Sequence, residues 1–191
     1  MGWLDSFKKP QAGPIEDFSG SIFKQAAEGV DAIRKLAEDK SVEQDKYGLG
    51  SLEWMKVFFE FQNFYLHLTD RFAFGRLDEQ KRGKVMTELE RVSIDTSVET
   101  ICKDWPRDKI ANIKKECMDN FLVSMQDYAQ YKKLFPDEGQ GPKDTLLWEF
   151  GKQIASLSGR PFDMAFIIAG VELASKALTE LDINSFIAKV R

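Results

Sequence analysis

Apolar residues recur at steps of three and four along most of the chain, which is the spacing of one face of an α-helix. The first such stripe covers residues 15–36 and consists of Ile15, Phe18, Ile22, Ala26, Val30, Ile33 and Leu36. Pro10, Gly13 and Pro14 interrupt the chain just before this stripe. We therefore expect a flexible N-terminal arm over residues 1–14 and a single folded domain over residues 15–191.

Residues 52–74 form the most apolar stretch, and its apolar side chains surround most of a helix circumference. A helix that is apolar on nearly all sides is typical of the buried centre of a bundle. Glu60, His67 and Asp70 interrupt the stretch too often for a membrane span, where ionisable residues are costly. Ser51 before the stretch and Gly75 after it suit the two ends of a helix.

Further stripes predict helices over residues 78–102, 106–135, 144–157 and 162–181, with a final short helix over 182–190. Polar residues near Asp95 favour either a peripheral helix there or a break in it. Glu172 and Lys176 stand four apart and are expected to form an ion pair. The pattern predicts an all-α, single-domain helical bundle of about six helices. The long apolar helix is at its centre, and the helices over 78–102 and 106–135 form a long antiparallel hairpin.

Charge and cysteine content bear on the partners and the location of the protein. The formal net charge is −4 and no basic stripe is present, so we expect no nucleic-acid partner. Cys102 and Cys117 lie at unequal distances from the Trp105–Pro106 turn, a mismatch of about 10 Å along two paired helices. A disulfide is therefore not expected. Two free thiols, with no membrane-length apolar run, indicate a reducing cytoplasm.

Complete catalytic motifs are absent from the sequence. The glycine pairs at residues 48–50 and 139–141 lack the flanking residues of a phosphate-binding loop. His67 is the sole histidine, and no nucleophile elbow accompanies it. The sequence therefore favours a protein that is not an enzyme, with no cofactor.

One polar pattern on the long apolar helix stands out. Six residues at alternating steps of three and four share one face, and we call them the polar seam: Glu53, Lys56, Glu60, Asn63, His67 and Asp70. The simpler interpretation is a solvated stripe with contacts among the first three and His67 near Arg71. The alternative is a buried polar network. The candidate binding residues are Glu53, Glu60, Asn63, His67, Asp70 and Arg71.

A metal site is a weaker hypothesis for the same face. His67 and Asp70 have the i, i+3 spacing that lets two side chains bind one ion. Helical di-metal proteins, however, use Glu-x-x-His pairs, and this chain contains none. No metal is therefore predicted, and His67 with Asp70 remains the alternative.

Three functions are compatible with these features. The 15 Phe and 4 Trp favour a non-enzymatic interaction or scaffold protein that self-associates or binds a protein partner. Its candidate docking aromatics are Trp3, Phe7, Trp54, Trp105 and Trp148. The second is a bundle that binds a small molecule or lipid in an apolar cavity lined by Phe58, Phe61, Phe64, Tyr65, Phe166 and Ile168. The third is a metal-binding bundle that uses His67 and Asp70.

Overall fold

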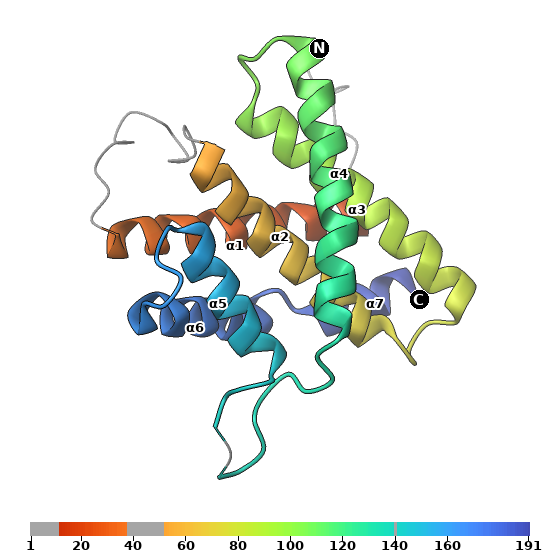
Figure 1. The fold of residues 1–191 in the computed structure, drawn as a ribbon. Coiled ribbons are helices and arrows are strands. Elements are labelled where there is room, and N and C mark those ends of the chain that lie inside the picture. The colour runs from red at the N-terminus through yellow and green to blue at the C-terminus, as the bar shows by residue number, and fades with distance from the viewer. Residues whose placement is uncertain (1–11, 38–51, 140) are drawn as a thin grey trace, which may run out of the picture.

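A computed structural model describes residues 12–37, 52–139 and 141–191, and the all-α prediction is confirmed for them (Figure 1). The helices are α1 (Pro14–Leu36), α2 (Leu52–Ala73), α3 (Glu79–Ile101), α4 (Arg107–Ala129), α5 (Leu146–Leu157), α6 (Met164–Glu180) and α7 (Ile183–Val190). The described residues thus form seven helices rather than about six. The short C-terminal segment is a helix of its own because the Asp182 side chain caps it by accepting from the Ser185 N–H.

Several predictions concern residues that lie partly or wholly outside the described ranges. Of the predicted arm over residues 1–14, residues 1–11 lie outside the described part, and Pro14 is already the first residue of α1. The cap at Ser51 and the glycine pair at 48–50 also lie outside it. None of the described helices has the length and apolar character needed to cross a membrane.

α2 is the most deeply buried helix, and every residue from Val57 to Thr69 is buried. It contacts α1, α3, α4, α5 and α7, so neighbouring helices cover it on several sides (Figure 1). Aromatic rings fill much of this contact. Phe64 stacks on Phe150 of α5 at a centroid distance of 4.0 Å, and Phe61 meets the same ring edge-on at 5.1 Å. These pairs explain why one helix carries so many aromatic residues.

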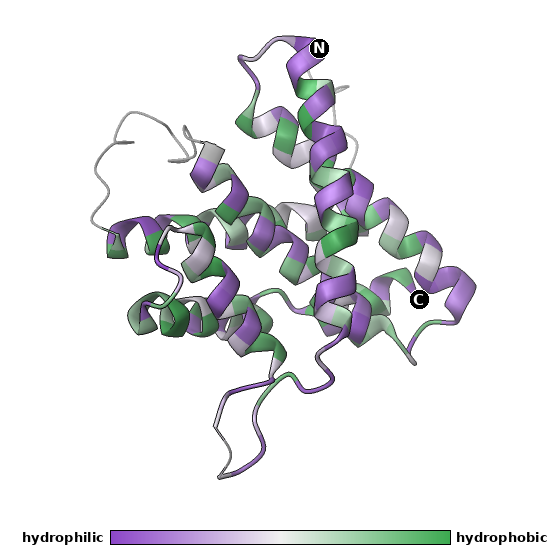
Figure 2. Ribbon diagram, in the orientation of Figure 1, coloured by the Kyte–Doolittle hydropathy of each residue, from purple (hydrophilic) through white to green (hydrophobic). Residues whose placement is uncertain are grey.

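α5 and α6 approach each other closely through two glycines that the sequence analysis did not single out. A Cβ on Gly170 would lie 3.0 Å from the Cα of Gly151. A Cβ on Gly151 would lie only 2.5 Å from the backbone oxygen of Ile167. α6 therefore packs backbone to backbone on α5. Figure 2 shows that α6 is largely apolar, whereas α3 and α4 carry polar residues over much of their length.

α3 is continuous through the polar residues at which a break was one alternative. Asp78 caps its N-terminus by accepting from the Lys81 N–H at 2.9 Å. Two of the polar side chains in the middle bond to other helices instead of to their own backbone. Ser97 donates to Gln62 of α2, and Asp95 pairs with Lys114 of α4 at 2.7 Å. At these two positions the side chain does not compete with the helix for its backbone hydrogen bonds.

α4 ends at Ala129, so the prediction that it extends to residue 135 is wrong. The guanidinium of Arg71 donates hydrogen bonds to the backbone carbonyls of Tyr131 and Lys132, each at 2.6 Å. The next carbonyl, of Lys133, accepts from the Leu146 N–H at the start of α5. These bonds to other parts of the chain replace the helical ladder after Ala129.

Two smaller predictions had different outcomes. Cys102 and Cys117 are free, as expected, and both are buried. Lys176, in contrast, does not pair with Glu172. Its ammonium lies 3.5 Å from Glu180 and 3.8 Å from Glu28 of α1, so it bridges two helices in place of the predicted local pair.

Candidate functional site

The structure divides the polar seam of α2 by burial. Glu53 and Lys56 are exposed and Asp70 is half-buried. The middle residues are covered: Glu60 is 9% exposed, Asn63 3% and His67 6%. The solvated-stripe interpretation therefore does not hold for the middle of the seam, which forms a buried polar network under α4.

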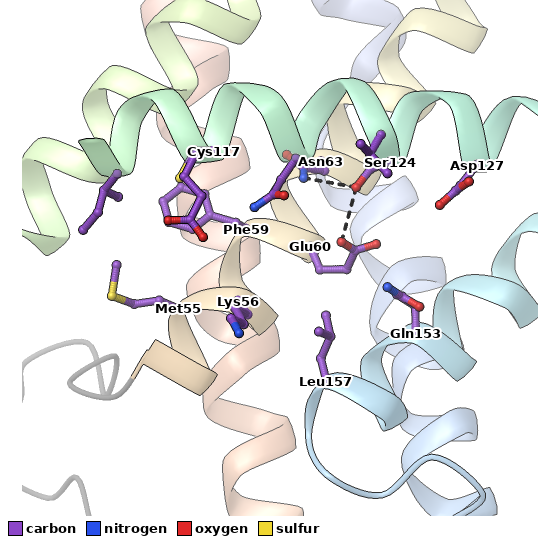
Figure 3. Close-up of a pocket in the computed structure, with 14 residues that line it drawn as sticks. Met55, Lys56, Phe59, Glu60, Asn63, Cys117, Ser124, Asp127, Gln153 and Leu157 are labelled. Atoms are coloured by element: carbon purple, nitrogen blue, oxygen red, sulfur yellow. Dashed lines mark hydrogen bonds between the residues drawn. The ribbon is translucent and has the colours of Figure 1, made fainter. Parts of the chain in front are cut away.

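Glu60 is the centre of this network. Its Oε1 accepts from the Tyr128 hydroxyl of α4, while its Oε2 has only a long contact of 3.5 Å with the Ser124 hydroxyl. Asn63 donates to the same hydroxyl at 3.4 Å (Figure 3). Burial raises the pKa of Glu60, the two hydroxyl contacts oppose that rise, and the nearby charge of Asp127 adds to it. Glu60 is thus a buried carboxyl whose donors are both neutral.

His67 lies about two turns beyond Glu60 along α2, beside the Tyr128 ring at a centroid distance of 5.5 Å. Its Nε2 is buried and has no hydrogen-bond partner. Burial lowers the pKa of His67 to about 4, and the positive charge of Arg71 contributes to that change. His67 is therefore a neutral imidazole at neutral pH.

Asp70 and Arg71 bind other parts of the chain at the end of α2. Both carboxylate oxygens of Asp70 lie 2.9 Å from the Arg82 guanidinium of α3. Arg71 binds the two carbonyls that follow α4. Among the described residues, no group of three or more His, Cys, Asp or Glu is placed to hold an ion. The metal hypothesis on His67 and Asp70 therefore lacks a third ligand there.

A cleft of about 390 Å³ opens beside the network, between α2, α4 and α5. Its apolar lining is Met55, Phe59, Ile113, Cys117, Val123 and Leu157. Its polar lining is Lys56, Glu60, Asn63, Glu116, Asn120, Ser124, Asp127 and Gln153. Figure 3 shows the Glu60 side chain between α4 and the residues Gln153 and Leu157 of α5. The buried carboxyl therefore reaches the wall of a cleft that combines apolar and polar surface.

Cys117 is the one thiol in this lining, and its environment does not suit a nucleophile. Burial raises its pKa to about 12, and the charges of Glu116 and Cys102 act in the same direction. Because the thiolate is the reactive form, Cys117 stays an unreactive thiol at neutral pH.

Of the six candidate binding residues, Glu60 and Asn63 line the cleft, whereas Glu53, His67, Asp70 and Arg71 do not. The residues that α4 and α5 contribute were not predicted. Ser124 and Tyr128 stand four apart on α4, which was the only signal that a hydroxyl pair faces α2. Gln153 gave no signal. Of the residues expected to line an apolar cavity, Phe58, Phe61, Phe64 and Tyr65 are buried in a filled core, Phe166 is buried, and Ile168 is exposed. The cleft is lined by a different set of residues.

Comparison with known proteins does not identify a family for this chain. The chain matches no known family model, no curated protein and no solved structure.

Proposed function

We propose that this protein binds a small molecule in the cleft between α2, α4 and α5 and does no chemistry on it. The observation that carries the proposal is Glu60, a buried carboxyl with one poorly satisfied oxygen on the cleft wall. In this proposal the helices form a bundle around α2, with α3 and α4 as a long antiparallel hairpin. The two free thiols suit a reducing cytoplasm as its location.

The dimensions and lining of the cleft support a ligand site. Small-molecule sites have volumes of roughly 300 to 1,000 Å³ and combine apolar walls with a few placed polar groups. The cleft has about 390 Å³, with Phe59 and Leu157 among its apolar walls. Glu60, Asn63 and Ser124 are already joined by contacts across two helices. Polar groups held in this way bind a ligand without first paying the cost of ordering them.

Native mass spectrometry of gently purified protein tests the proposal. We expect the wild type to carry an additional small mass at a stoichiometry of one. Val123→Trp should remove it by filling the cleft, whereas Leu122→Trp should retain it. The two positions are a matched pair, because they are 58% and 54% exposed and only Val123 lines the cleft. A wild type that carries no ligand, or equal retention by the two variants, would contradict the proposal.

A second candidate function is self-association, the role expected from the aromatic surplus. Phe162 is 91% exposed, and Met164 and Ile168, four apart at the start of α6, are exposed beside it in sequence. Burying such residues against a second copy of the chain would remove apolar surface from water. Light scattering should then show a dimer that Phe162→Ser converts to a monomer. A wild type that is already a monomer at high concentration would exclude this candidate.

The tryptophans expected to form docking anchors contribute less to that candidate. Trp54 is buried, Trp148 is half-buried, and Trp105 is exposed in the turn before α4. Trp3 and Phe7 lie outside the described residues. The exposed apolar residues around the start of α6 therefore provide its structural support.

A further inference from the structure

We infer that the ligand of the cleft is an organic cation, a primary ammonium on an apolar body, with the ammonium beside Glu60. This inference rests on the proposed function, since it names the chemical class of the molecule that the cleft binds.

The charges around Glu60 favour a cation. On α4 the polar groups that line the cleft near it include Ser124 and Asp127, and Tyr128 bonds to it from the same helix. On α5 the facing polar group is the neutral Gln153. No Lys or Arg in the described ranges forms an ion pair with Glu60, although buried carboxylates are normally paired. The missing counter-charge is the one an ammonium ligand would supply.

Acidic residues outnumber basic ones in the cleft lining. Glu60, Glu116 and Asp127 carry acidic groups, and Lys56 is the one basic residue among the lining residues. Lys56 is exposed. A carboxylate or phosphate ligand would have to approach this acidic lining, so an anion is disfavoured.

Hydrogen-bond acceptors are also arranged for an ammonium, which has three donors and no acceptor. The Oε2 of Glu60 has only its long contact with Ser124. Asn63 donates to Ser124 through its Nδ2, which leaves its Oδ1 able to accept. The side-chain amide of Gln153, which is uncharged, lies across the cleft (Figure 3). Phe59 and Leu157 would contact the apolar body.

Binding of an ammonium ligand would release one proton from Glu60. In the free protein, burial favours the protonated form of Glu60. An ammonium beside it favours the carboxylate, so the Glu60 O–H bond breaks, the proton leaves to the solvent, and the ion pair forms. The release is largest at pH values where free Glu60 is protonated, and it disappears at higher pH.

Isothermal titration calorimetry with 2-phenylethylamine, 2-phenylethanol and 3-phenylpropanoate tests the inference. The wild type should bind the amine about tenfold or more tighter than the alcohol, and the carboxylate weakest. The heat of amine binding should depend on the ionisation enthalpy of the buffer at acidic pH, and this dependence should fall as the pH rises. Glu60→Gln should lose both the amine preference and the buffer dependence. Asp127→Asn should weaken amine binding by about two- to threefold.

Asp119→Asn is the matched control, because Asp119 is an exposed α4 carboxylate that does not line the cleft. It should change neither result. Binding of the alcohol as tight as that of the amine would overturn the inference and leave the proposed function standing. Failure of all three probes would count against both. If Glu60→Gln does not fold, the buffer dependence of the wild type and the Asp127→Asn result still decide the question.

Discussion

Replacing His67 with glutamine should change how the stability of the protein depends on pH. The pKa of the histidine is about 4 in the folded chain and about 6.5 in the unfolded chain. Above pH 6.5 both states hold a neutral ring, and the folded state keeps its full stability. As the pH falls from 6.5 to 4, only the unfolded chain takes up a proton, so stability is lost. Since one pKa unit corresponds to about 1.4 kcal/mol, the full loss is about 3 kcal/mol.

Urea unfolding followed by circular dichroism at several pH values measures this loss. The free energy of unfolding of the wild type minus that of His67→Gln should fall by about 3 kcal/mol between pH 7 and pH 4. Carboxylates titrate in both proteins, so their contributions cancel in the difference. Lys109→Gln, at an exposed position of α4, is the control and should give a flat difference.

A flat difference for His67→Gln would refute this reasoning. An independent check is the imidazole titration by NMR, which is unambiguous because the chain has one histidine. A ring that titrates near pH 6.5 would show that His67 is solvated, and the buried-network description of the seam would be wrong.

Three further predictions concern packing and burial. Gly151→Ala should destabilise the fold by about 1 to 3 kcal/mol, because its Cβ would meet an α6 carbonyl, whereas Gly20→Ala, with open space around it, should stabilise it by about 0.5 to 1 kcal/mol. Urea unfolding compares the pair, and equal effects would contradict the close helix contact. Tyr128→Phe should cost about 1 to 3 kcal/mol by removing a donor to Glu60, and the cost should grow as the pH rises and Glu60 ionises, because the ionised carboxylate loses most. Burial raises the pKa of Glu90 to about 7, so wild-type stability relative to Glu90→Gln should fall as the pH rises from 4.5 to 7; a constant difference would show that Glu90 is solvated.

Local chemistry was sufficient to predict most of the helices. Helical periodicity and end signals act within a few residues, so they can be read without knowing the neighbours. Asp78 caps α3, and Gly75 and Gly159 have φ of +76° and +70° just after α2 and α5. The one large error in helix length is at the end of α4, which was predicted to extend to residue 135. There Arg71, from another helix, donates hydrogen bonds to the backbone carbonyls that follow α4.

Tertiary packing decided the environment of each helix face. The spacing of the polar seam showed that Glu60, Asn63 and His67 share a face, but the same spacing fits a face in water and a face under another helix. α4 buries these residues, and Tyr128 and Ser124 supply their contacts across more than sixty positions of sequence. The close contact of Gly151 with α6 has the same origin. Burial, the pKa changes that follow from it and the cleft beside Glu60 all depend on which helix lies opposite, and periodicity along one helix holds no information about that partner.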